Sequence, residues 1–220
     1  MNGLWVLLLL ILVSTLPVLA VFIWFRVGKY PMTTPAFLLS LLGGAVAILI
    51  AALVQGLFPQ DTPVSFREIL FKLFVQVSLI EEGSRLAVIL LLLWLGKRVF
   101  KASANIPAQG AAIGLLTGLG FAVIENASYG AADLGLALVR VVTAAPLHGA
   151  CGGRVGVAAV QLVSGQGRPI PRFLSAVAIH GMYDLMVVSP RFPAAIPIIL
   201  AFVSLLPTIQ MIRTGRAAVE

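Results

Sequence analysis

The chain has 220 residues, of which 60% are hydrophobic and only 10% are charged. Soluble domains carry about 25% charged residues, so this composition excludes an ordinary soluble protein. The chain has a single cysteine, Cys151, which excludes an internal disulfide framework and a CxxC metal site. The net charge of +7 is compatible with nucleic acid as a partner, and the positions of the charges decide this question.

Seven apolar segments follow one another along the chain and predict membrane-spanning helices. A span needs about 20 residues at about 1.5 Å each to cross ~30 Å of hydrocarbon. We therefore expect an all-α, polytopic membrane helix bundle that forms one integral membrane domain over residues 1–220, with the catalytic helices within about residues 69–188. The segments cover residues 4–25, 35–57, 69–95, 107–129, 134–163, 173–188 and 193–212.

The basic residues gather after every second segment. The positive-inside rule places such residues in the cytoplasm. We therefore expect the N-terminus outside and the C-terminus in the cytoplasm, with the lipid bilayer and no nucleic acid as a partner. The residues that carry this prediction are Arg26, Lys29, Lys97, Arg98, Lys101, Arg168, Arg172, Arg213 and Arg216.

The third segment contains two glutamates and an arginine in the run LIEEGSRLAV, residues 79–88. A charge at the centre of a membrane helix costs ~2.5–3.5 kcal/mol, so these groups must face the bundle interior, pair or take up protons. Glu81 and Arg85 are four residues apart and share a helix face. Because Glu82 points about 100° away from Glu81, we expect only one glutamate to align with Arg85. The other is then free for catalysis or ion handling.

The fourth segment combines a glycine repeat with an acid and an amide. Gly110, Gly114 and Gly118 recur every fourth residue, which indicates close helix packing. Glu125 and Asn126 follow near the end of the segment. The amide of Asn126 could donate a hydrogen bond to a developing oxyanion.

Both histidines of the chain lie within predicted spans, at the depth of the glutamate pair. His148 is surrounded by small residues in HGACGG, and His180 is followed four residues later by Asp184, which could orient it. We expect one polar chamber that collects the glutamates and both histidines. Cys151 is interpreted as a packed thiol. Arg140 and Arg154 are interpreted as snorkelling or ion-paired residues.

Four motifs in this order resemble those of the PrsW family of glutamic-type intramembrane proteases, distant relatives of the CAAX prenyl protease (CPBP) group. EEGSR at 81–85 fits EExxK/R, and FAVIEN at 121–126 fits FxxxEN. RVVTAAPLHGACGGRVG at 140–156 is similar to the family's R…PxH…G segment, and HGMYD at 180–184 fits HxxxD. The resemblance covers about residues 75–190, and Arg85 stands where lysine is common.

The resemblance implies a multi-pass protease of the bacterial inner or plasma membrane, acting on a membrane-protein or peptide substrate with a transmembrane segment. Its functional residues would be Glu81, Glu82, Glu125, His148 and His180, supported by Asn126, Asp184 and the Arg85 ion pair. We expect no required cofactor. The alternative is a divalent metal such as zinc, held by Glu82, His148 and His180.

Two other functions stay open from the residues. Intramembrane Glu, His and Arg also serve proton relays, so a proton-coupled transporter or channel is the main alternative. No inverted repeat or pair of broken helices is visible in the sequence to support a transporter. A catalytically inactive membrane scaffold is the third possibility.

Overall fold

The computed structural model describes residues 3–30, 32–59, 61–95, 107–130 and 134–217. Within these ranges the regular structure is entirely helical, which confirms the predicted all-α bundle. The helices are α1 (Gly3–Ser14), α2 (Leu16–Val27), α3 (Thr34–Gln55), α4 (Phe66–Phe71), the π-helix η1 (Lys72–Leu79), α5 (Ile80–Leu95), α7 (Pro107–Gly130), α8 (Leu134–Ser164), α9 (Pro169–Val188) and α10 (Ala195–Ala217).

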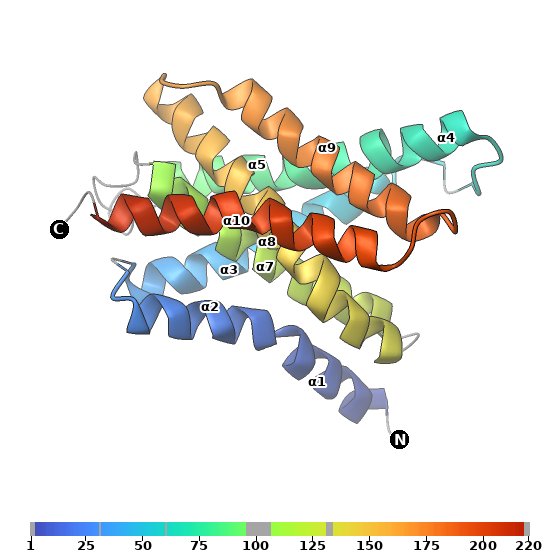
Figure 1. Ribbon diagram of the computed structural model, residues 1–220, viewed down its shortest axis with the longest axis horizontal. Helices are drawn as coiled ribbons and strands as arrows, with labels where there is room; N and C mark the ends of the chain where they lie inside the picture. The colour runs from blue at the N-terminus through green and yellow to red at the C-terminus, as the bar shows by residue number, and fades with distance from the viewer. Residues whose placement is uncertain (1–2, 31, 60, 96–106, 131–133, 218–220) are drawn as a thin grey trace.

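The bundle is built around α7 and α8. Figure 1 shows these two helices at the centre, with α1 and α2 along one edge and α9 and α4 toward the opposite side. Most of α7 is buried, whereas only 17–33% of the apolar stretches Leu8–Val27, Thr34–Gln55 and Ala195–Gly215 is buried. The centre of the bundle is therefore where polar side chains can be kept from lipid.

Two predicted spans are not continuous α-helices. The first divides into α1 and α2 at Thr15. Pro17 lies in the first turn of α2, where a backbone N–H would have no partner within the helix, so proline is tolerated there. The third consists of α4, η1 and α5 in succession. Within the described residues, four helical segments are long and apolar enough to cross a membrane by length and composition: Leu8–Val27, Thr34–Gln55, Pro107–Tyr129 and Ala195–Gly215.

The orientation in the membrane stays a prediction. Lys97, Arg98 and Lys101, which contribute to it, lie outside the described residues, as does the side chain of Arg216. The buried Cys151 is the only cysteine of the chain. Cysteines introduced at Lys29 and Asp61 would therefore report the two sides of the membrane by labelling.

One face of α3 is apolar and exposed on the outside of the bundle. Large apolar side chains are exposed there at intervals of three to four residues, which places them on one stripe of the helix. A stripe of this kind fits lipid and not water. Its members are Leu38, Leu42, Val46, Leu49 and Leu53.

Glycines hold α7 and α8 in backbone contact. A Cβ on Gly114 would lie 2.0 Å from the carbonyl oxygen of Gly152, and a Cβ on Gly118 would lie 2.0 Å from that of His148. Gly110 faces Gly156 in the same way. This confirms the packing interpretation of the glycine repeat, and it fixes the depth of His148 against α7.

Replacing Gly114 by alanine should lower the free energy of unfolding by about 1–3 kcal/mol, the usual cost of overpacking. The added methyl group would meet backbone and not a flexible side chain, so the two helices must separate. Gly83 is the matched control, because a Cβ there meets nothing within 4 Å. The measurement is unfolding in detergent, monitored by the loss of helicity. Gly83→Ala should be at least as stable as the wild type, and Gly114→Ala should be less stable.

The π-helix η1 leads directly into the glutamate pair. Ser78 Oγ donates to the carbonyl of Leu73, five residues earlier, at 2.7 Å. On the facing helix α9, a Cβ on Gly181 would lie 2.5 Å from the ring of Phe74, so only glycine permits this approach. Close packing at Gly181 sets His180, its neighbour, beside the start of α5. Short π segments often occur at functional sites.

Candidate active site

Both glutamates at the start of α5 contact Arg85. Glu81, Glu82 and Arg85 are all buried. Arg85 NH2 lies 3.3 Å from Glu81 Oε2, and Arg85 NH1 donates to Glu82 Oε1. The expectation that only one glutamate would align with Arg85 is therefore wrong. Residues three and four apart are both neighbours on a helix, and the guanidinium fork is wide enough to reach the two carboxylates.

His180 joins this pair from α9. Its Nδ1 lies 2.7 Å from Glu82 Oε1, which also accepts from Arg85. A carboxylate oxygen that accepts from an arginine is an acceptor for histidine too, so we assign the His180 proton to Nδ1. The other ring nitrogen, Nε2, faces Glu81 Oε2 at 3.7 Å and Asp184 Oδ2 at 3.5 Å.

His148 joins from α8 on the other side of Arg85. Its Nδ1 lies 2.9 Å from Arg85 NH2, and its Nε2 lies 2.6 Å from Glu125 Oε2. Arginine can only donate, so Nδ1 accepts and Nε2 carries the proton that Glu125 receives. The two imidazole rings are 5.2 Å apart and nearly perpendicular. The structure therefore brings both histidines to the glutamate pair, as their predicted depths indicated.

Arg140 connects the cluster to a second pair of predicted residues. Its NH2 lies 2.7 Å from Glu125 Oε2, and its Nε donates to Asn126 Oδ1 at 3.1 Å. Arg140 is thus ion-paired, one of the two readings that its sequence position gave. Because the oxygen of the Asn126 amide faces arginine, its NH2 group points elsewhere, and this buried Nδ2 has no hydrogen-bond partner among the described residues.

Two side chains of the cluster were missed by sequence reasoning. Gln55, at the end of α3, donates to Glu81 Oε1 at 3.3 Å. The ring of Phe121 lies 4.1 Å below the Arg85 guanidinium and 5.3 Å from the His148 ring. Phe121 is the first residue of FAVIEN, so that motif contained a signal for it. Gln55 ends an apolar helix that gives no such signal.

A divalent metal ion would find three ligand residues here. Glu81, His148 and His180 each offer one ligand atom, and these atoms lie within 4.8 Å of one another. The predicted ligand set contained Glu82 in place of Glu81, but Glu82 binds Arg85 and His180 Nδ1. Glu82 and Glu125 each accept from one ring nitrogen of a histidine, which is the usual arrangement around a metal-binding histidine. The donor set therefore fits zinc in kind.

An apolar cavity of about 290 Å³ borders the cluster. It lies between α8, α9 and the start of α10, and Arg140, Thr143 and Tyr183 are its polar lining residues near the site. Tyr183 donates to Thr143 Oγ1 at 2.9 Å. Because Arg140 lines the cavity and also binds Glu125, it connects the cavity with the buried acids. The apolar lining includes Val139, Met186, Val187, Phe192 and Ile198.

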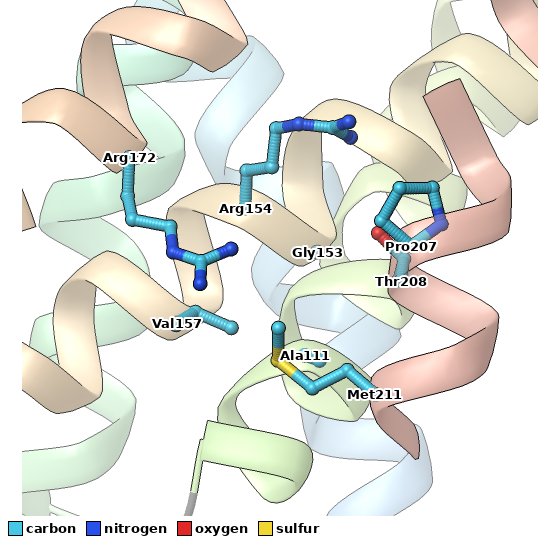
Figure 2. Close-up of a pocket in the computed structure, with 8 residues that line it drawn as sticks. All are labelled: Ala111, Gly153, Arg154, Val157, Arg172, Pro207, Thr208 and Met211. Carbon is cyan, nitrogen blue, oxygen red and sulfur yellow. The ribbon is translucent and has the colours of Figure 1, made fainter. Parts of the chain in front are cut away.

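Arg154 and Cys151 stand apart from this chemistry. Arg154 donates to the carbonyl oxygens of Ala150 and Ser204, at 3.0 and 2.7 Å. Figure 2 shows it with Arg172 and Thr208 around a separate small pocket of about 40 Å³. The buried thiol of Cys151 donates to the carbonyl of Ala176 at 3.5 Å, so it packs as a small residue.

Comparison with known proteins identifies one family. A family model described as "PrsW family intramembrane metalloprotease" matches residues 31–211. No curated protein and no solved structure shows a significant match to the chain. The matched region contains the whole cluster, from Gln55 on α3 to Asp184 on α9.

Proposed function

Because the chain belongs to the PrsW family of intramembrane proteases, we propose that it hydrolyses a peptide bond in or near the membrane span of a membrane protein, with water activated by Glu81. The observation that carries this proposal is the meeting of Glu81, Glu82, His148 and His180 in one buried cluster. Three separate helices, α5, α8 and α9, contribute these four residues, and an ion pair that served stability alone would not need them.

Glu81 is the carboxylate best placed to act as the base. Glu82 is held by Arg85 and by His180 at 2.7 Å, and Glu125 is held by Arg140 at 2.7 Å and His148 at 2.6 Å. The contacts of Glu81 are longer, at 3.3, 3.3 and 3.7 Å. A loosely held carboxylate can exchange one of its partners for a water molecule, whereas the other two are fixed as orienting groups.

The positions of Glu81, His180 and Asn126 support the following order of steps. Glu81 takes a proton from water as the water oxygen attacks the scissile carbonyl carbon. The negative charge moves to the carbonyl oxygen, which the unpartnered Nδ2 of Asn126 can stabilise. Glu81 returns the proton to the amide nitrogen as the C–N bond breaks. His180, held by Glu82 and faced by Asp184, orders the water beside Glu81.

A bound divalent metal would be held by Glu81, His148 and His180 and would supply a Lewis acid and a more acidic water at the same place. Glu82 and Glu125 have the same tasks in either case. Glu82 orients His180, and Glu125 orients His148.

The apolar cavity beside Arg140 is the proposed binding site for the substrate's membrane segment. Its volume of about 290 Å³ is enough for a few apolar side chains, and small-molecule sites of similar kind begin at ~300 Å³. The side chains of Glu125 and Asp184 are 16% and 22% exposed, more than the rest of the cluster. Substrate would thus approach from the Glu125 and Asp184 side.

Filling this cavity should weaken substrate binding without removing the chemistry. We expect Val139→Trp to raise KM for a single-span substrate by about tenfold, since about 1.4 kcal/mol of binding corresponds to that factor, with kcat changed little. Leu49→Trp, on the lipid-facing stripe of α3, is the control. Equal effects of the two variants on KM would argue against this location.

The central experiment is cleavage of single-span test substrates by the purified protein, with and without a chelator. Cleavage that survives chelation supports the glutamic mechanism. Cleavage lost on chelation and restored by zinc assigns Glu81, His148 and His180 to metal binding. Absence of cleavage, together with proton flux in liposomes, would favour a transporter. In a cell, we expect the protein in the bacterial inner membrane, where fractionation would find it.

A further inference from the structure

The guanidinium of Arg85 lies among the atoms that would bind a metal ion. Its NH2 nitrogen is 2.9 Å from His148 Nδ1 and 3.3 Å from Glu81 Oε2. Both residues belong to the Glu81, His148 and His180 set. Arg85 is completely buried, so no water shell dilutes its charge.

The proton positions decide which histidine nitrogens could face a metal. His148 Nε2 donates to Glu125, and His180 Nδ1 donates to Glu82. The lone pairs that remain are on His148 Nδ1 and His180 Nε2. Of these, His148 Nδ1 already accepts from Arg85. One arginine nitrogen thus engages two of the three candidate ligand residues.

Arginine cannot relieve this conflict by losing its proton, because a guanidinium stays protonated in proteins. The Phe121 ring also holds the guanidinium in position, since Arg85 Cζ lies 4.1 Å from the centroid of this ring. A cation over an aromatic face is stabilised there. Glu82 holds the other terminal nitrogen of the guanidinium.

We propose that Arg85 is the resident cation of this site and that its guanidinium and a divalent metal ion exclude each other. With Arg85 in place, Glu81 Oε2 and His148 Nδ1 already accept from its guanidinium, and a metal ion binds only if Arg85 withdraws from them. This inference deepens the proposed function and rests on it for its meaning. Its test measures metal affinity and not cleavage, so the two can fail separately.

The experiment compares zinc and cobalt binding to purified wild type and Arg85 variants, by calorimetry and by the ligand-field absorption of Co²⁺. Arg85→Gln should bind either metal at least about tenfold more tightly than the wild type, because a fixed like charge a few ångströms from the ion is removed. Arg85→Lys keeps the charge and should stay within about threefold of the wild type. Arg172→Gln, which removes an arginine that lines the separate pocket beside Arg154, is the control.

Two further variants keep the test decisive. If Arg85→Gln does not fold, because Glu82 loses its partner, the Glu82→Gln/Arg85→Gln double variant removes both charges and retains the candidate ligands. Adding His148→Ala to either should abolish the gain in affinity. The proposal would be overturned if the wild type bound zinc with the same affinity as Arg85→Gln and the double variant. It would also be overturned by an Arg85→Lys variant that gains as much affinity as Arg85→Gln.

Discussion

Replacing Glu81 by glutamine should lower the cleavage rate of the folded, purified protein by about 10²–10⁴-fold, the contribution that general base catalysis supplies. Glutamine keeps the shape of the side chain and can still receive the hydrogen bond from Gln55. It cannot take a proton from water. Folding should therefore survive, and the measurement is the rate of product formation from a single-span substrate in detergent.

The comparison with Glu82→Gln separates a reacting carboxylate from an orienting one. Glu82 is held by Arg85 and His180 through shorter contacts than those of Glu81. It is therefore assigned an orienting role, and Glu82→Gln should reduce the cleavage rate less than Glu81→Gln. A Glu81→Gln/Glu82→Gln double variant that cleaves at close to the wild-type rate would show that the glutamic mechanism is wrong. Loss of bound zinc in Glu81→Gln would instead assign Glu81 to metal binding.

The second large effect should come from the histidines. His148→Ala and His180→Ala should each abolish detectable cleavage, because each ring contacts the glutamates or Arg85 directly. Substrate should still co-purify with both variants, since the apolar cavity is lined by other residues. Pull-down of a tagged substrate and a cleavage assay on the same preparations give the two readouts.

Asp184→Asn is the graded control for the histidine variants. Asp184 Oδ2 lies 3.5 Å from His180 Nε2, and Glu82 holds the opposite nitrogen of the same ring at 2.7 Å. His180 therefore keeps its main orienting partner when Asp184 is changed. The rate should fall but stay measurable, and complete loss would mean that Asp184 takes part in the reaction itself.

The sequence predicted the helical membrane bundle and the meeting of the polar groups, because both follow from the cost of polar atoms in hydrocarbon. Spacing along one helix predicted the contacts of Glu81 with Arg85 and of His180 with Asp184, which the structure contains. Such contacts are local, and helix periodicity is enough to find them.

Contacts between helices were less accessible from the sequence. Nothing near His148 in the chain indicates that its Nδ1 accepts from Arg85 or that its Nε2 donates to Glu125. These contacts depend on how far α5, α7 and α8 are rotated about their axes. The π-helix changes that rotation for α5, and no sequence pattern used above distinguishes it from an ordinary helical turn. Most of the residues that meet in the cluster were therefore predictable from the sequence, but their contacts between helices were not.

The charge balance of the cluster has a consequence for how the protein handles protons. Four carboxyl groups, those of Glu81, Glu82, Glu125 and Asp184, meet two guanidinium groups, those of Arg85 and Arg140. With neutral histidines, the fully ionised cluster carries two negative charges in excess. A buried imbalance of this size is costly, so the resting protein should retain up to two extra protons. They belong to the cluster as a whole. A dication that bound after Arg85 withdrew would displace such protons, which couples metal uptake to proton release and makes the state of the site sensitive to pH at the membrane.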